Sequence, residues 1–287
     1  MKGKEYIDLH SHTIYSDGSD TPESLMRAMH MSGVNLAAVT DHDTLASYPR
    51  AKAEADHYGF RIIPGVEIST TRYHILGLNV NPEHKKLLAL LEHSQRLQVD
   101  QCRQRIDNLT AHGVPITLDK LRALYPDARL GTWNITMTML GDVPCREYLT
   151  RMHGYLPVPR EVHDYYLRNG GIGAKTKKNE SIRSKEAIAA IHDAGGIAIV
   201  AHPFKEVKDI EQELGRLRVK GIDGLEIQLN FGDNNEPFRQ YALEHGWTMT
   251  YGSDFHGAGY DRALLGRREN INAIDCEQLE KMLIAWK

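Results

Sequence analysis

Three things are scarce in this sequence of 287 residues: cysteine, long hydrophobic runs and an excess of positive charge. The three cysteines, Cys102, Cys145 and Cys276, are far apart and form no C-x-x-C pair, which argues against a disulfide framework or a zinc knuckle. The formal net charge of −3 argues against a dedicated nucleic-acid-binding protein, because such a protein needs a cationic face. No segment is typical of a signal peptide or a membrane span, so we expect a cytoplasmic protein.

Histidine, in contrast, is abundant, with fifteen residues in the chain. Several histidines and two carboxylates follow short apolar runs that are typical of buried strands. These residues are His10, His12, His42, Glu67, His202, Asp254 and His256, and His74 follows Glu67 along the chain. Packing alone does not explain so many side chains of this kind at strand ends.

The organisation of the chain predicts an α/β barrel with an insertion. Strand and helix patterns alternate near the N-terminus and resume after residue 184. Between them, the pattern is mainly helical. We therefore predict a barrel formed by residues 1–80 and 181–287, with a parallel sheet and outer helices, and a helical insertion over residues 81–180 that caps the substrate. The expected strands lie near residues 6–9, 36–40, 61–67, 73–80, 197–201, 224–228 and 247–252, and the expected helices near 21–32, 46–58, 82–105, 184–194, 209–219 and 236–244.

The strand ends predict where these side chains meet. In parallel α/β barrels, functional residues gather at the carboxyl ends of the strands, so residues distant in sequence come together there. Imidazole and carboxylate groups suit zinc, manganese, iron and related divalent ions. A carboxylate such as that of Glu67 can bridge two ions, and two ions ~4 Å apart can activate a water and hold the oxygens of a phosphoryl group. We therefore expect a metal centre at the mouth of the barrel.

The same residues carry a family signature. The chain resembles the polymerase-and-histidinol-phosphatase (PHP) family, and most closely its stand-alone bacterial metal-dependent phosphoesterases. The motifs that carry this resemblance are Asp8-Leu9-His10-Ser11-His12, Tyr15-Ser16-Asp17-Gly18, Thr40-Asp41-His42-Asp43, Gly65-Val66-Glu67, His74 before Ile75-Leu76-Gly77, Ala201-His202-Pro203 and Gly252-Ser253-Asp254-Phe255-His256. It implies a distorted (β/α)7 barrel that binds two or three divalent ions.

The resemblance also implies a division of the metal ligands. One ion would be held by His10, His12, Glu67 and Asp254. A second would be held by Glu67, His74 and His202. A third would be held by Asp17, His42 and His256, and Asp17 enters the set only through the resemblance.

The implied activity is hydrolysis of a phosphoester. A hydroxide held by the metals would attack the phosphorus of a small phosphorylated metabolite or nucleotide, either a phosphomonoester or a cyclic or bis-phosphate. Asp43 is our candidate for the acid that protonates the leaving group. Lys175, Lys177 and Arg267 are candidate substrate-phosphate ligands, although a solvated loop is the simpler explanation for the lysines and surface charge is the alternative for Arg267.

Two segments of the insertion depart from the family pattern, and this leaves the substrate open. Stand-alone relatives often carry Arg-x-His where this chain has Thr132-Trp133-Asn134, and a Gly-Lys-Pro loop where it has Gly170-Gly171-Ile172-Gly173. The main alternative activity is a 5'-3' exonuclease on short RNA or oligonucleotides. An amidohydrolase and a non-catalytic interaction module are two further alternatives. We expect no obligate protein partner.

Overall fold

The computed structural model describes residues 6–168, 170–174, 181–228, 232–257 and 265. The chain divides into two compact units, formed by the described parts of Met1–Glu92 with Ser181–Lys287 and of His93–Glu180. The first is called the barrel unit below and the second the insertion. The boundary at residues 92 and 93 lies inside a continuous helix, α3 (Lys85–Ala111). A substrate-capping role for the insertion remains a prediction.

The barrel unit contains seven strands that neighbour one another in chain order. They are β1 (Ile7–Asp8), β2 (Leu36–Val39), β3 (Arg61–Ser69), β4 (His74–Leu78), β5 (Ile197–Val200), β6 (Gly224–Gln228) and β7 (Thr248–Gly252). The backbone N–H of Leu9 donates to the carbonyl of Tyr251 at 2.8 Å, and that of His12 to Phe255 at 2.8 Å, so the first and last strands meet. The predicted seven-stranded α/β barrel is confirmed, and it is nearly closed.

The prediction of an all-parallel sheet is wrong at β4, which runs antiparallel to both β3 and β5. Only four residues, Thr70–Tyr73, separate β3 from β4. A connection this short permits a hairpin, whereas a parallel pair needs a crossover of a dozen residues or more. The antiparallel strand therefore begins at the edge where its neighbours end, and His74 pairs in register with Ser69.

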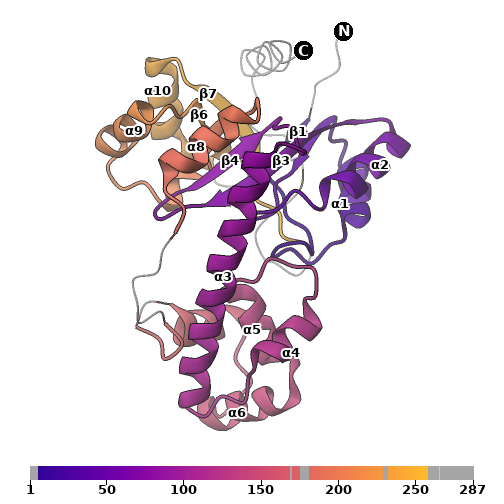
Figure 1. The fold of residues 1–287 in the computed structure, drawn as a ribbon, viewed down its shortest axis with the longest axis vertical. Helices are drawn as coiled ribbons and strands as arrows, with labels where there is room; N and C mark the ends of the chain where they lie inside the picture. The colour runs from indigo at the N-terminus through magenta and orange to yellow at the C-terminus, as the bar shows by residue number, and fades with distance from the viewer. Residues whose placement is uncertain (1–5, 169, 175–180, 229–231, 258–264, 266–287) are drawn as a thin grey trace. The chain divides into compact units, whose positions relative to one another are not determined.

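Five helices of the barrel unit lie close to the predicted positions in the chain. Figure 1 shows α1 beside α2 and α2 beside β3, α8 beside β4, and α10 beside β6 and β7. Local sequence fixes their ends: the hydroxyl of Thr21 accepts from the backbone N–H of Ser24, and Gly59 ends α2 in the left-handed conformation. These helices are α1 (Pro22–Met31), α2 (Tyr48–Tyr58), α8 (Ser184–Asp193), α9 (Ile210–Val219) and α10 (Glu236–His245). Short 3-10 turns, η2 (Pro203–Lys205) and η3 (Gly232–Asn235), lie after β5 and β6.

The described part of the insertion is helical and has its own apolar core. After α3 come α4 (Leu118–Leu124), α5 (Thr132–Gly141), α6 (Val143–His153), α7 (Pro159–Val162) and the π-helix η1 (His163–Leu167). Cys102 and Cys145 are free thiols buried in this core, where they pack as small apolar side chains. Across the described residues, no helix combines the length and apolar character needed to cross a membrane.

Candidate metal centre

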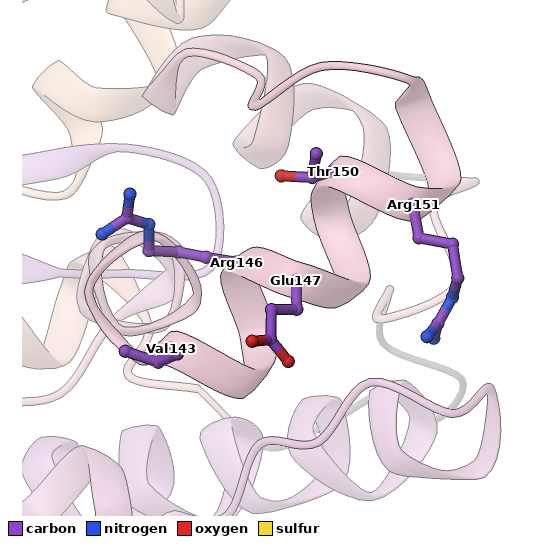
Figure 2. A pocket seen from close by; sticks show the side chains of 5 residues that line it. All are labelled: Val143, Arg146, Glu147, Thr150 and Arg151. Atoms are coloured by element: carbon purple, nitrogen blue, oxygen red, sulfur yellow. The ribbon is translucent and has the colours of Figure 1, made fainter.

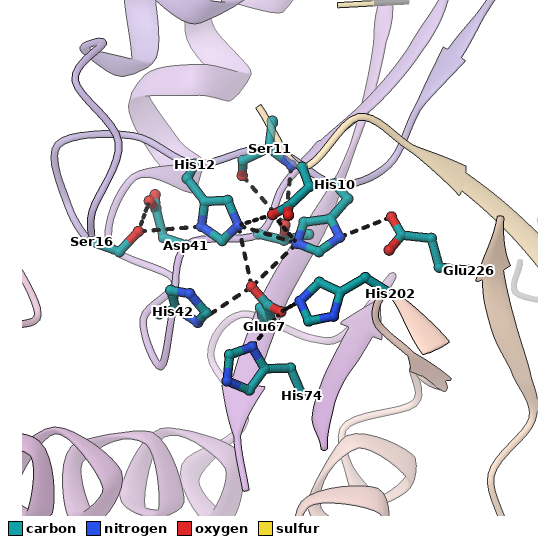
Figure 3. Close-up of polar contacts among 12 residues, drawn as sticks. His10, Ser11, His12, Ser16, Asp41, His42, Glu67, His74, His202 and Glu226 are labelled. Carbon is teal, nitrogen blue, oxygen red and sulfur yellow. Dashed lines mark hydrogen bonds and ion pairs between the residues drawn. The ribbon is translucent and has the colours of Figure 1, made fainter. Parts of the chain in front are cut away.

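The carboxyl ends of the barrel strands and the start of β4 bring the predicted ligands together. Figure 3 shows His10, His12, His42, His74 and His202 arranged around Glu67, which lies among them. His10, His12 and Glu67 have no exposed surface, and His42 and His202 retain only 7% and 6%. All nine side chains that the sequence predicts as metal ligands belong to groups whose donor atoms lie within 4.8 Å of one another.

Four donor atoms form the tightest group. Nε2 of His10 and Nε2 of His12 lie 3.1 Å apart, and each lies 3.2 Å from Oε2 of Glu67. Each nitrogen also lies 3.4 Å from Oδ1 of Asp254. Ligands placed about 2.0–2.1 Å from a tetrahedral zinc ion lie about 3.3–3.4 Å from one another, so the donor set fits a small divalent cation.

The other oxygen of Glu67 belongs to a second group. Oε1 lies 2.9 Å from Nδ1 of His74 and 2.9 Å from Nε2 of His202. Because the two oxygens of one carboxylate face two different sets of imidazoles, Glu67 has the geometry of a bridging ligand. Glu206, which sequence reasoning missed, joins His74 and His202 in a further cluster.

The third group is looser. Asp17 lies 3.7 Å from Nε2 of His42 and 3.5 Å from Nε2 of His256. Nδ1 of His12 also lies 3.7 Å from Asp17, so His12 stands between the first and third groups. The division implied by the family resemblance assigns His12 to one group alone, whereas in this structure its two ring nitrogens face different groups.

Burial and opposite charges shift the pKa values of the cluster strongly. Burial by itself would raise the pKa of Glu67, but the charges of His42, His10 and His74 outweigh it and hold this pKa well below its usual range. Burial lowers the pKa of His12, yet hydrogen bonds to Asp254 and Glu67 outweigh it and raise the pKa to about 10. Protons and metal cations therefore compete for the same imidazole nitrogens.

Residues behind the cluster fix its orientation. Oε1 of Glu226 lies 2.8 Å from Nδ1 of His10, so Nε2 of that ring faces the cluster. Asp41 accepts hydrogen bonds from the backbone N–H of Thr13 at 2.7 Å and from the hydroxyl of Ser16 at 2.6 Å, which holds the loop after His12. Sequence reasoning missed Glu226, although a fully buried charged residue inside the apolar strand Gly224–Gln228 is a usable signal.

The backbone at this mouth is locally strained. Asp43, His202 and Asp254 have φ angles of 54°, 71° and 57°, in the left-handed region that non-glycine residues seldom adopt. Gly252 is required by a close approach, because a Cβ atom there would clash with His10 and with the Glu226 carboxylate. Strained backbone that persists at one place is a typical mark of a functional site.

Of the remaining predicted site residues, the structure describes Asp43. Asp43 is fully buried, and its Oδ1 accepts from the backbone N–H of Ser69 at 2.9 Å, so it also joins two strand ends. Its role as a proton donor remains a prediction. Lys175, Lys177 and Arg267 lie outside the described residues.

The insertion carries two features that the sequence did not predict. Thr132, in the segment that departs from the family pattern, has its hydroxyl 3.2 Å from Nε2 of His163, whose ring lies 5.9 Å from that of Trp133. A cavity of about 550 Å³ lies against α6 (Figure 2). It is lined by Val143, Arg146, Glu147, Thr150 and Arg151. None of these lining residues is among the predicted ligands.

Comparisons with known proteins show the family of the chain. The model of the PHP domain matches residues 8–143, which include six of the nine predicted ligands. A 5'-3' exoribonuclease of Haemophilus influenzae is 32% identical and aligns with 88% of this chain and 90% of its own length. A 3',5'-nucleoside bisphosphate phosphatase of Chromobacterium violaceum is 28% identical over 93% of both chains.

A solved structure extends the likeness to the whole fold. An amidohydrolase from Chromobacterium violaceum, solved with bound sulfate and without metal, has 27% sequence identity and a TM-score of 0.79, and the match covers 96% of each chain. The likeness in sequence and fold therefore extends over nearly the full length of the chain. The chain belongs to the PHP family of phosphoester hydrolases.

Proposed function

We propose that this protein hydrolyses phosphate esters of small metabolites or nucleotides with the help of two or three divalent metal ions. The observation that carries the proposal is the buried group formed by His10, His12, Glu67 and Asp254. Five distances between the nitrogen and oxygen donor atoms of this group fall between 3.1 and 3.4 Å. A set of imidazole and carboxylate groups this close is best explained by a shared cation.

The proposed ligands form three sets. These are His10, His12, Glu67 and Asp254; Glu67, His74 and His202; and Asp17, His42 and His256, with His12 beside the third set as well. When bound, divalent ions supply Lewis acidity and lower the pKa of water from ~16 to near 7. Nitrogen and oxygen donors of this kind accept manganese, iron and zinc, so we propose one of these three.

The protein's own groups orient and shelter the reaction. Glu226 holds the His10 ring so that Nε2 faces the cluster, and the strand ends fix Glu67 between two ligand sets. Burial of the cluster strengthens its electrostatic interactions with a phosphoryl group, because the local dielectric is low. Asp43 would donate the proton that the leaving alkoxide needs, if its carboxyl is released from Ser69.

Relatives support a nucleotide-type substrate. The Chromobacterium violaceum relative is named for 3',5'-nucleoside bisphosphates, and an Eggerthella lenta relative for phosphoribosyl 1,2-cyclic phosphate. The solved amidohydrolase holds a sulfate, a tetrahedral oxyanion with the shape of phosphate. We therefore propose a substrate in which a phosphate is attached to a ribose.

A 5'-3' exonuclease acting on short RNA is the second candidate. The Haemophilus influenzae relative carries this name, and the charge of the insertion favours a longer polyanion. Residues 93–180 contain thirteen Lys and Arg against nine Asp and Glu, although the whole chain is negative. Such an enzyme would release mononucleotides from an oligomer. A cytoplasmic location and the lack of an obligate protein partner stay predictions under either function.

One screen separates these activities. Purified protein loaded with manganese, iron or zinc is incubated with phosphorylated sugars, nucleoside bisphosphates and a short 5'-phosphorylated RNA, and free phosphate and mononucleotides are quantified. We expect phosphate release that a chelator abolishes. Asp254→Asn should remove the activity, whereas Asp56→Asn, whose side chain is 60% exposed on α2, should not. Hydrolysis of C–N bonds without phosphate release, or turnover in the metal-free protein, would contradict the proposal.

A further inference from the structure

A positively charged side chain reaches the metal centre from a turn that sequence reasoning did not single out. After β5, His202 adopts a left-handed conformation, and a 3-10 turn (Pro203–Lys205) follows. In a 3-10 helix, residues three apart lie on the same side, so Lys205 lies on the side of His202, whose ring faces Glu67. The turn is anchored, because the next residue, Glu206, accepts from the backbone N–H of His74 at 3.0 Å.

Lys205 contacts one of the proposed metal ligands directly. Its Nζ lies 2.5 Å from Oδ2 of Asp254, while Oδ1 of the same carboxylate lies 3.4 Å from the rings of His10 and His12. The two oxygens of Asp254 therefore face different partners, the imidazole cluster on one side and the lysine on the other. The Lys205 side chain retains 31% of its exposure, whereas Asp254 retains 13% and Glu67 none. Lys205 thus stands at the solvent side of the cluster, where a substrate would arrive.

We propose that Lys205 is a substrate-phosphate ligand that Asp254 holds in place beside the metal centre. This inference rests on the proposed phosphoesterase function. A divalent cation bound by Oδ1 of Asp254 would take up much of the negative charge of that carboxylate. The ammonium group of Lys205 would then be the closer partner for the negatively charged oxygens of a phosphoryl group. This is the role that the sequence predicted for Lys175, Lys177 or Arg267.

The simplest rival explanation gives Lys205 a structural role only, as the group that positions Asp254. The two explanations differ in what happens to metal binding. Removing a cation that competes for Asp254 should leave metal binding unchanged or tighter, whereas removing a group that positions Asp254 should weaken it. The binding of inorganic phosphate can be measured separately from both metal content and turnover.

The experiment compares Lys205→Met, Lys205→Arg and the control Lys208→Met, which changes an exposed lysine three residues along the chain. Each protein is loaded with Mn²⁺ and desalted, its metal content is measured by mass spectrometry, and inorganic phosphate binding is measured by calorimetry. We expect wild-type metal content in all variants and a loss of phosphate affinity of about 10- to 100-fold in Lys205→Met. Lys205→Arg should lose about threefold or less, and Lys208→Met nothing.

Two results would overturn the inference. One is full metal content with undiminished phosphate binding in Lys205→Met, and the other is loss of metal in that variant, which would assign Lys205 to the positioning of Asp254. Failure of the phosphoesterase proposal would look different. In that case the wild-type protein would release phosphate from no substrate, while its phosphate affinity could still depend on Lys205.

Discussion

The barrel unit and the insertion use buried groups in opposite ways. The barrel buries ionisable residues at its mouth, including His10, Glu67 and Glu226, whereas the core of the insertion is built from apolar side chains such as Leu149 and Ile135. The formal charges differ as well, because residues 93–180 carry an excess of four positive charges and the rest of the chain an excess of seven negative ones. Within the described residues, the clusters of side chains that could hold a metal ion all belong to the barrel unit.

This difference allows the site of the reaction and the selection of the substrate to be considered separately. Buried charges cost free energy unless they are paired or bind a cation. The ionisable residues buried at the barrel mouth therefore indicate a functional site. The insertion combines an apolar core with an excess of positive charge in its sequence, and we expect it to help select an anionic substrate. We therefore expect the reaction to be a property of the barrel, and four predictions test whether the two units can be perturbed independently.

Glu67→Gln should have the largest effect. The substitution keeps the shape of the side chain but removes the charge that faces both imidazole groups. We expect loss of bound metal and a fall in phosphate release of about 1,000-fold, because several kcal/mol of transition-state stabilisation depend on the ions. Metal analysis and phosphate-release kinetics measure both effects. The control is Glu83→Gln on the exposed connection before α3, and wild-type metal content in Glu67→Gln would refute the bridging role.

Leu149→Ala should affect the insertion and spare the metal centre. Leu149 is fully buried in the core of the insertion, and its truncation should cost about 2–5 kcal/mol of unfolding free energy for that unit. Urea unfolding followed by circular dichroism measures the loss, and metal analysis tests the barrel. The matched control is Leu124→Ala, which is 56% exposed on α4. If Leu149→Ala also emptied the metal centre, the two units would not be independent.

Glu226→Gln should have a smaller effect, confined to the barrel. The amide can still contact Nδ1 of His10, but it loses the charge that stabilises the ring orientation. Metal affinity should fall by about 10- to 100-fold, which is typical when a carboxylate behind a ligating histidine is replaced. Titration with a fluorescent chelator measures the affinity. Glu244→Gln on the exposed face of α10 should leave it unchanged, and an equal loss in both variants would show a nonspecific charge effect.

Much of this arrangement could be predicted from the sequence because strand ends are local features. His10, His12 and His202 follow apolar runs, and parallel strand pairing brings such ends together without further information. His74 could not be explained in this way, since it begins a strand whose direction depends on a short hairpin. Glu226 and Lys205 were missed because their roles depend on contacts with residues far away in the sequence. Glu226 contacts His10, and Lys205 contacts Asp254.

The smallest effect should come from a helix cap in the insertion. Asp142 accepts from the backbone N–H of Cys145 at the start of α6 and from Nζ of Lys120 at 2.9 Å. The hydrogen bond from Lys120 and the contacts with Cys145 outweigh partial burial and lower the pKa of Asp142. A carboxyl whose pKa is lower in the folded state stabilises that state above its unfolded pKa of about 3.9, and this contribution is lost as the pH falls through the folded pKa.

Asp142→Ala should therefore cost about 1 kcal/mol of unfolding free energy at pH 7, and the difference from the wild type should shrink below pH ~4. Asp142→Asn keeps a capping oxygen but loses the charge that faces Lys120, so its cost should be smaller. Urea unfolding at pH 7 and at pH 3.5 measures both variants. Because the cap lies in the insertion, metal content should stay at the wild-type level. A cost that did not change with pH would mean that Asp142 acts through the geometry of the cap alone, without a contribution from its charge.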